Sequence, residues 1–206
     1  MSIVKLNNRG VRSATTFGSI TALGSMTFIK KLTASSSATI SFVHGTSDVV
    51  LDNTYKEYLF TFNNIHPATD NADFTFNMSV DSGSNYNVTK TTTVATAQHS
   101  EAGSDTGIFY VTADDLAQST AFQIVLGLIG NDADQSASGS LTLFNPSSTT
   151  FVKHFIATGN SYYSGNYSLN DYVAGYGNTT SAVDAVQFKM SSGNTDAGDI
   201  CLYGIK

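Results

Sequence analysis

The stretch Tyr58-Leu59-Phe60-Thr61-Phe62 places a large aromatic residue at every second position, and Phe74-Thr75-Phe76-Asn77-Met78 repeats this alternation further along the chain. Successive side chains of a β-strand point to opposite faces, so a two-residue period gathers the apolar residues on one face. Aromatic residues also suit the pleated surface of a sheet. These two segments therefore predict strands whose aromatic faces are buried.

The same short, alternating pattern continues from Met26 onward, with clusters of Gly, Asn, Asp and Ser between the segments. Patterns of helical length are scarce, and one helical turn is expected at Thr112–Gln118, with Thr112 as its N-cap. About ten strands predict an all-β fold, an antiparallel β-sandwich of jelly-roll type formed by residues 26–206. The other predicted strands are Thr39–Val43, Tyr86–Ala95, Ile108–Val111, Phe122–Ile129, Leu141–Phe144, Phe151–Ile156, Tyr172–Tyr176, Val183–Met190 and Ile200–Ile205.

Two later segments share one layout. Residues 122–144 and residues 186–203 each read as a strand, a Gly-Asn turn, an acidic loop, a glycine and a second strand ending in Leu and an aromatic residue. Two copies of one hairpin would occupy equivalent places in the two sheets of a jelly roll. The alternative is that any two hairpins look alike in a chain of this composition.

Residues 1–25 differ from the rest of the chain, because they are rich in small polar residues and show no sustained hydrophobic period. A terminal segment without a core of its own becomes ordered when something holds it in place. We expect residues 1–25 to form an extended N-terminal arm that anchors the chain to other subunits of an assembly.

Composition excludes several classes of partner. Charged residues make up 13% of the chain, against the usual ~25%, and the formal net charge is −6. A nucleic-acid partner needs clustered Lys and Arg, so none is expected. The chain has no apolar run long enough for a secretory signal or a membrane span, so we expect no membrane partner. Its single cysteine, Cys201, forms no internal disulfide and fits a protein made in a reducing cytoplasm.

Catalytic signatures are missing from the sequence, so we expect no enzyme, no cofactor and no metal. The four histidines lie far apart, and there is no Gly-x-Ser-x-Gly or phosphate-binding glycine motif. A hydrolase of envelope sugars would need two paired carboxylates in a cleft, but the chain has only two glutamates, Glu57 and Glu101, and most of its aspartates fall in turns. Asp81–Asn85 and Asn131–Asp134 carry oxygen ligands that could suit calcium, but ordinary turn chemistry explains both.

A stretch rich in tyrosine is the strongest candidate for binding. Asn160–Ser168 mixes Tyr, Ser, Gly and Asn, which adaptable recognition loops use because Tyr offers a large amphipathic surface at low entropic cost. Aromatic faces beside amides and hydroxyls also suit sugars. The alternative is that these tyrosines are strand residues at a subunit interface. The candidate residues for binding a receptor or glycan are Tyr162, Tyr163, Tyr167, Tyr172 and Tyr176.

Five segments carry a resemblance to a known group of proteins. The sequence is similar to virion structural proteins, tail- or fibre-associated, of marine and cyanobacterial tailed bacteriophages. The segments that carry this similarity are Lys5–Gly10, Phe62–Asp70, Asp81–Tyr86, Leu143–Ser148 and Ser191–Ile205.

The resemblance implies a structural place in a virion. In such proteins an N-terminal arm anchors to the particle while a β-rich body trimerises or faces the host. The expected protein is thus a tail fibre, spike or tail-associated subunit, made in the host cytoplasm and assembled as a homo-oligomer, with a trimer expected. Residues 1–25 would contact other virion proteins, and the body could contact a host surface glycan. A carbohydrate-binding adhesion module and a head decoration protein are the alternatives.

Overall fold

The computed structural model describes residues 25–206. Twelve strands and no helix occur in that range, and all strand pairings are antiparallel. The prediction of an all-β, antiparallel fold is confirmed. The strands are β1 (Met26–Thr33), β2 (Ile40–Val43), β3 (Glu57–Pro67), β4 (Ala72–Ser79), β5 (Lys90–Ser100), β6 (Thr106–Tyr110), β7 (Gln123–Ile129), β8 (Ala137–Phe144), β9 (Lys153–Tyr163), β10 (Tyr167–Gly177), β11 (Ala185–Met190) and β12 (Thr195–Ile205).

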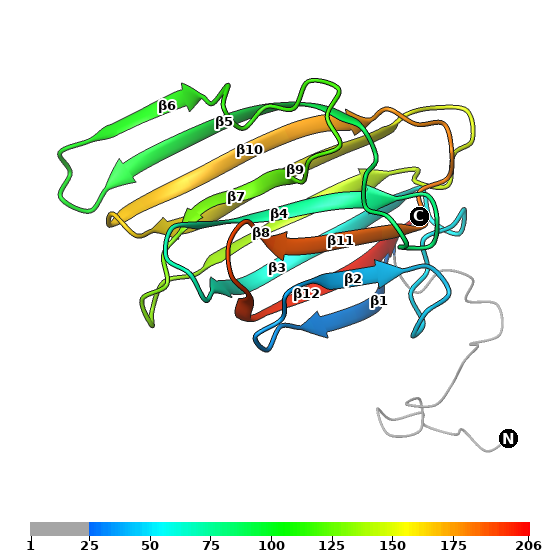
Figure 1. Cartoon of the computed structure of the whole chain (residues 1–206), viewed down its shortest axis with the longest axis horizontal. Coiled ribbons are helices and arrows are strands. Elements are labelled where there is room, and N and C mark those ends of the chain that lie inside the picture. The colour runs from blue at the N-terminus through cyan, green and yellow to red at the C-terminus, as the bar shows by residue number, and fades with distance from the viewer. Residues whose placement is uncertain (1–24) are drawn as a thin grey trace, which may run out of the picture.

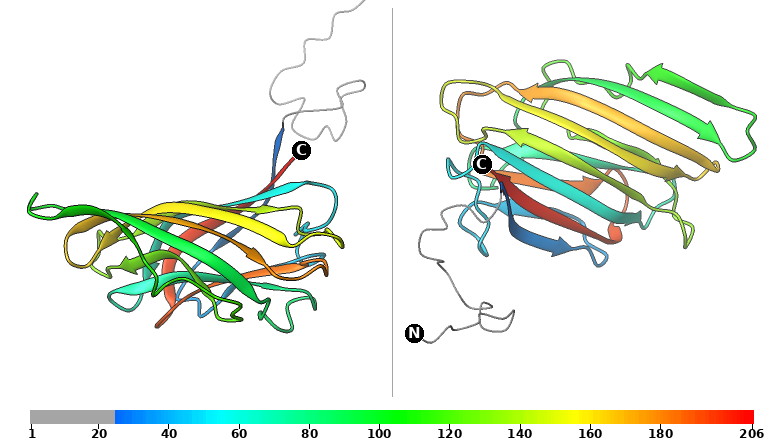
Figure 2. Two further views of the ribbon diagram at one scale, coloured as in Figure 1. Left: turned by 90° about the horizontal axis from the view of Figure 1, so that it is seen from above. Right: turned by 180° about the vertical axis from the view of Figure 1, so that it is seen from behind.

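Four pairs of strands are nested along the chain. The first strand pairs with the last, β1 with β12, and within this pair β2 lies beside β11, β3 beside β8, and β4 beside β7. The nested pairs alternate between two runs of neighbouring strands, β1-β12-β3-β8 and β2-β11-β4-β7. Figure 1 looks onto the second run, and the rear view in Figure 2 looks onto the first.

The remaining four strands widen the first run, and we call them the extension. β9 pairs with β8, and β10, β5 and β6 follow in that order. Figure 1 shows β6 as the outermost of these strands. A single pairing, Ile129 with Tyr163, joins β7 to β9 and makes all twelve strands one sheet that is nearly closed into a barrel.

The core lies between the two runs and consists mainly of phenylalanine rings. Phe62 of β3 meets Phe74 of β4 with ring centroids 5.2 Å apart, and Phe60 meets Phe188 of β11 at 5.3 Å, both edge to face. These four rings are fully buried or nearly so. Edge-to-face packing of this kind adds to the free energy gained by burying apolar surface. The prediction of buried aromatic faces is confirmed for both segments that suggested it.

Two paired glycines allow β7 to approach the opposite run closely. Gly139 of β8 lies directly beside Gly159 of β9. A Cβ on Gly159 would come within 2.4 Å of a Leu126 methyl group, and a Cβ on Gly139 within 2.6 Å of the Thr158 carbonyl oxygen. A side chain at Gly159 would push β7 away, whereas a side chain at Gly139 would collide with the backbone of the neighbouring β9.

The prediction of two similar hairpins is wrong, although the two segments do occupy equivalent places. β7 pairs with β4 and β9, whereas β8 pairs with β3 and β9, so β7 and β8 are not partners. Likewise β11 pairs with β2 and β4, while β12 pairs with β1 and β3. Each connection crosses from one run of strands to the other. The strands turn to different partners because each has an apolar face to bury against the opposite run.

The helical turn predicted at Thr112–Gln118 is also wrong, since that segment is an irregular connection with turns. Its acidic residue does not cap a helix. The Asp115 carboxylate instead accepts hydrogen bonds from the backbone N–H of Val94, at 2.8 Å, and from the Tyr110 hydroxyl. The Asp115 carboxylate therefore satisfies a backbone N–H group of β5 that would otherwise lack an acceptor, and it is not available as a helix cap.

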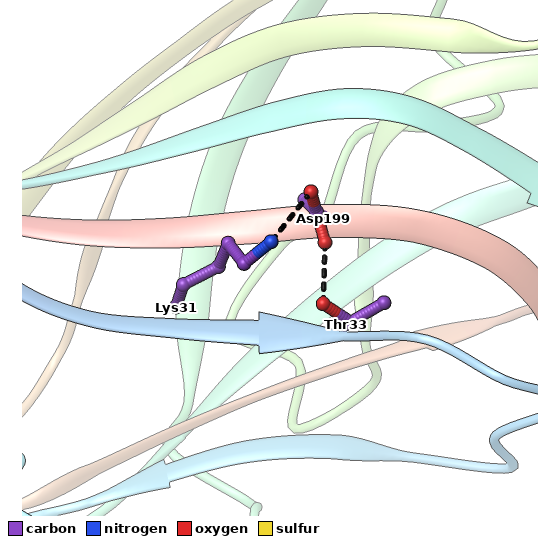
Figure 3. Close-up of polar contacts among 3 residues, drawn as sticks. All are labelled: Lys31, Thr33 and Asp199. Carbon is purple, nitrogen blue, oxygen red and sulfur yellow. Dashed lines mark hydrogen bonds and ion pairs between the residues drawn. The ribbon is translucent and has the colours of Figure 1, made fainter.

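One ion pair occurs among residues 25–206, and it joins β1 to β12. The Lys31 Nζ lies 3.1 Å from a carboxylate oxygen of Asp199, whose other oxygen accepts the Thr33 hydroxyl at 2.5 Å (Figure 3). The hydrogen bond from Thr33 is the main cause of the lowered pKa of Asp199. Exposed ion pairs contribute little to stability, so this contact mainly fixes the position of the first strand. The expected arm, residues 1–25, lies outside the described residues except for Ser25.

Candidate functional site

The five candidate tyrosines do not form one cluster. All belong to β9 and β10, which are joined by a tight turn at residues 164–166. Tyr162 and Tyr167 line a depression at this turn, whereas Tyr163 lines a separate pocket on the inner side of the extension. Tyr172 lies halfway along β10 on the outer face, and Tyr176 is near its end, with its ring 6.1 Å from that of His154. The structure therefore separates the candidates into distinct surroundings.

The depression at the β9–β10 turn has a volume of about 270 Å³. It is lined by residues from the end of β5, the end of β9 and the start of β10. The Asn160 amide nitrogen donates to the Ser168 hydroxyl at 2.8 Å and to the Leu169 carbonyl oxygen at 2.7 Å, which fixes the orientation of that side chain. Its lining residues are His99, Ser100, Glu101, Asn160, Ser161, Tyr162, Tyr167 and Ser168.

Carboxylates dominate the electrostatics around this depression. A hydrogen bond with Glu101 is the main cause of the raised pKa of Tyr162, and the charges of Asp132 and Asp134 act in the same direction. Desolvation and the nearby Asp105 raise the pKa of Tyr167, whose hydroxyl lies 3.3 Å from the Asp105 carboxylate. None of the described Lys and Arg residues lines the depression. The site therefore offers hydrogen-bond acceptors and a negative potential.

The outer face of the extension forms a second candidate, which we call the charge-free face. Strand register and side-chain alternation place 18 residues on it, and none of these is Asp, Glu, Lys or Arg. Its middle is hollowed and apolar, with a cavity of about 580 Å³ between Tyr110, Ile156 and Tyr172. The face consists of His154, Ile156, Thr158, Asn160, Tyr162, Ser168, Asn170, Tyr172, Ala174, Tyr176, Thr91, Thr93, Ala95, Ala97, His99, Thr106, Ile108 and Tyr110.

Large apolar side chains on this face are open to solvent. The exposed fraction is 81% for Ile108, 55% for Ile156 and 53% for Tyr172. They lie on β6, β9 and β10, which are joined in the order β6-β5-β10-β9, so they belong to one surface. A continuous apolar patch rimmed by polar groups is typical of an interaction site.

The edge of the extension is unprotected as well. Within the described part of the chain, β6 pairs only with β5, which leaves the other side of its backbone open. Edge strands commonly avoid association through Lys, Pro or a bulge. β6 has none of these, and Phe109 and Tyr110 are exposed beside Ile108.

A carboxylate cluster on the inner side of the extension has a structural explanation. The pKa of Asp171 is raised, mainly because the residue is buried, and the pKa of Asp114 is raised by burial and by the charges of Asp73 and Asp171. Two of these carboxylates accept hydrogen bonds from consecutive backbone N–H groups of β7. The N–H of Gly127 donates to Asp171 at 2.8 Å, and the N–H of Leu128 donates to Asp73 at 2.9 Å. Leu128 has a φ of 55°, where the ladder between β4 and β7 is irregular. The cluster therefore completes the hydrogen bonds of a β-bulge.

Sequence reasoning did not find two buried lysines that flank the same glycine. Lys90 and Lys153 both pair with Gly177 and are fully buried. The Lys90 ammonium position donates to Asn77 Oδ1 at 2.5 Å and to the Val88 carbonyl oxygen at 2.9 Å. Burial lowers the pKa of Lys90 to about 7. The sequence feature that could have indicated burial is the position of Lys90 between two threonines in a segment with strand alternation.

The segments considered for calcium binding are Asp81–Asn85 and Asn131–Asp134. Among residues 25–206, no group of three or more His, Cys, Asp or Glu side chains is placed to hold a metal ion. At Asp81–Asn85 the Asp81 carboxylate accepts the Ser79 hydroxyl at 2.6 Å and the Asn85 amide nitrogen at 2.7 Å, and these bonds lower its pKa to about 2. That geometry is the turn chemistry expected from the sequence.

Within residues 25–206, no helix is long and apolar enough to span a membrane.

Comparisons with known proteins give no match: no protein-family model fits the sequence, and no curated protein or solved structure matches the chain. The geometry of the extension is therefore what bears on function. Of the residues named from the sequence, Tyr162 and Tyr167 share the depression, and Tyr172 lies in the apolar middle of the charge-free face. Ile108, Tyr110 and Ile156 were missed as site residues, because only strand pairing shows that they meet.

Proposed function

We propose that this chain is a structural subunit of a tailed-phage virion and that it self-associates through the charge-free face. The observation that carries the proposal is the exposure of Ile108, Ile156 and Tyr172 on one uncharged surface. Burying apolar surface contributes about 25 cal/mol per Å², and stable interfaces bury roughly 1,200–2,000 Å² in total. Such a surface supports a subunit that functions in an assembly.

A second copy of this chain is the partner that the charges favour. The whole chain has a formal net charge of −6, so most of its surface repels another copy. The charge-free face is the region where two copies meet without that repulsion. β6 adds to this argument, because its open edge offers unpaired backbone groups to a strand of a neighbouring subunit.

We also propose that the fold is of the jelly-roll type. A jelly roll is a long antiparallel ribbon rolled so that successive strand pairs fall alternately in two facing layers. The nested pairs β1–β12, β2–β11, β3–β8 and β4–β7 alternate in this way. β5–β6 and β9–β10 are then insertions between ribbon strands, and together they form the extension. A strand order determined by crystallography that differs from this nesting would contradict the assignment.

The place in a virion is supported by the similarity of five segments to tail- or fibre-associated phage proteins. A tail fibre, spike or tail-associated position is proposed, with a head decoration protein as the alternative in the same class. Docking to other virion proteins is assigned to residues 1–25, and the assembly is expected to be a trimer. The charge-free face would then lie between neighbouring subunits of that assembly.

Self-association is tested with charges placed on the face. In Ile108→Asp/Ile156→Asp, buried carboxylates would have to lose water at the interface, so the protomer is expected to remain folded but to stay monomeric. The matched control is Phe151→Asp, because Phe151 is 69% exposed and lies outside the charge-free face. Light scattering gives the mass, and far-UV circular dichroism reports folding. A monomeric wild-type protein, or dissociation of the Phe151 variant as well, would contradict the proposal.

Docking through the arm is tested by truncation. A chain that begins at Thr27 is expected to fold and to form the same oligomer, yet to be missing from purified phage particles. Mass spectrometry of the particles measures incorporation, with full-length protein supplied from the same vector as the control. Normal incorporation of the shortened chain would remove the role of residues 1–25.

A further inference from the structure

We propose that the depression at the β9–β10 turn binds a neutral saccharide. This inference goes beyond self-association and does not rest on it. The depression lies at one end of the charge-free face, six residues along β9 from Ile156, which corresponds to roughly 20 Å at the rise of a strand. A ligand there leaves the apolar middle of the face available for a second copy.

Size and composition favour a single sugar ring. At about 270 Å³ the depression is slightly smaller than the ~300–1,000 Å³ pockets that hold drug-sized ligands. Tyr162 supplies an aromatic face, on which the C–H groups of a pyranose can pack. The Glu101 carboxylate accepts hydrogen bonds only, and a pair of neighbouring sugar hydroxyls can donate to its two oxygens. His99 and Ser168 add groups that both donate and accept.

Several groups are already held in place. The amide nitrogen of Asn160 is committed to Ser168 and Leu169, so its carbonyl oxygen is left as an acceptor for a ligand hydroxyl. Glu101 follows β5, and its backbone N–H donates to the Asn166 carbonyl oxygen at 2.9 Å, which ties the two turns together. Asn166 has a φ of 63°, a conformation that Asn tolerates better than most residues. Binding would therefore cost little ordering of the loops.

Charge excludes one class of ligand. Asp105, Asp132 and Asp134 surround the tyrosines, and the lining of the depression within residues 25–206 has no Lys or Arg, so phosphates and acidic sugars are repelled. Among residues 25–206, no group of three or more His, Cys, Asp or Glu side chains is placed to hold a metal ion here. A polyhydroxylated, uncharged ring matches the acceptors and the aromatic face together.

Of the five candidate tyrosines, two line the depression, and polar side chains from neighbouring strands complete the proposed sugar site. Tyr162 packs on the ring, Glu101 and Asn160 accept its hydroxyls, and Tyr167 closes the side of the depression, its ring 5.7 Å from that of Tyr163. Tyr176 lies at the opposite end of β10 and has no part in the site.

The test is saturation-transfer NMR on the full-length protein with methyl glucoside, methyl galactoside and methyl mannoside as probes. Glucosamine and sialic acid serve as the cationic and anionic comparisons. We expect at least one neutral glycoside to bind, with affinity reduced about tenfold in Tyr162→Ala and severalfold in Glu101→Gln. The matched control Tyr176→Ala should bind as the wild type does.

Three results would overturn the inference: no neutral glycoside binds, binding is unchanged in both depression variants, or only a charged sugar binds. The mass of each sample is measured by light scattering in the same buffer. A wild-type protein that is monomeric yet binds the glycoside would count against self-association alone. An oligomer that binds no glycoside would count against the saccharide site alone.

Discussion

The phenylalanine core and the extension are built from the same alternating sequence pattern, yet they bury it in different ways. Between β3 and β11, Phe60 and Phe188 face one another across two layers and are fully excluded from solvent. In the extension, Ile156 and Tyr172 occupy equivalent alternating positions but remain about half exposed, because no second layer formed by residues 25–206 covers them. Alternation therefore reports strand structure, and only the presence of an opposite layer makes a face into a core.

The inner side of the extension differs from the phenylalanine core as well. There the connection after β6 covers the sheet through hydrogen bonds: Thr92 donates to Gln123 Oε1 at 2.6 Å, and the Leu116 N–H donates to the Thr92 hydroxyl at 2.8 Å. Such bonds contribute about 0.5–1.5 kcal/mol each, but leaving one partner unpaired costs more. The inner side of the extension thus adds specific polar contacts to apolar packing, since Val94, Phe155 and Val173 belong to the buried cluster of the core.

The largest expected effect comes from removing a ring at the centre of the core. Phe188 packs against Phe42, Phe60, Phe62 and Phe74, so Phe188→Ala leaves a cavity and should lower the free energy of unfolding by about 3–5 kcal/mol. The control Tyr172→Ala removes a similar ring from the charge-free face. It should change the stability of the protomer by less than about 1 kcal/mol. Urea denaturation of both variants in the Ile108→Asp/Ile156→Asp background, which is expected to be monomeric, measures protomer stability alone. Equal losses would show that the two regions do not differ.

An effect that depends on pH is expected where the extension meets the core, at Lys90. Its folded pKa of about 7 is below the ordinary value of 10.5, so between these pH values the unfolded chain holds a proton that the folded chain lacks. The unfolded state then binds more protons, and stability rises as pH increases from about 7 toward 10.5. Each unit of pKa difference corresponds to about 1.4 kcal/mol, so the free energy of unfolding should rise by a few kcal/mol over this pH range. Below pH 7 both states are protonated and the full cost of burying the charge applies.

The pH effect is isolated by comparison with Lys90→Met, which keeps the length of the side chain and removes the titrating group. The difference in unfolding free energy between the two proteins should change across pH 7–10 and level off below that range. Urea titrations at several pH values measure it. A constant difference would show that Lys90 keeps its charge in the folded protein.

Prediction from sequence succeeded where a local pattern was decisive. Tyr58–Phe62 and Phe74–Met78 lie within β3 and β4, and their aromatic residues are in the core. It failed for residues 122–144 and 186–203, because a Gly-Asn turn between two strands looks the same whether the strands pair or cross between layers. β1 was missed as a separate strand because Met26–Thr33 carries no strict alternation and is half exposed.

The candidate site was predictable in part. The composition of Asn160–Ser168 pointed to Tyr162 and Tyr167, since Tyr, Asn and Ser form recognition surfaces wherever they are exposed. Glu101, some 60 positions away in the chain, joins them only because β5 lies beside β10, and Ile108 joins Ile156 through the same pairing. No local pattern contains that information.

The order of residues was enough to establish that this protein is made of alternating strands with aromatic faces and a surface low in charge. Those properties depend on neighbours one or two positions apart, where side-chain direction follows from the backbone. Which strand faces another layer and which faces solvent depended on the nesting of distant pairs, β1 with β12 and β4 with β7. Long-range pairing is chosen by the total area buried over the whole sheet, and no short segment can specify it.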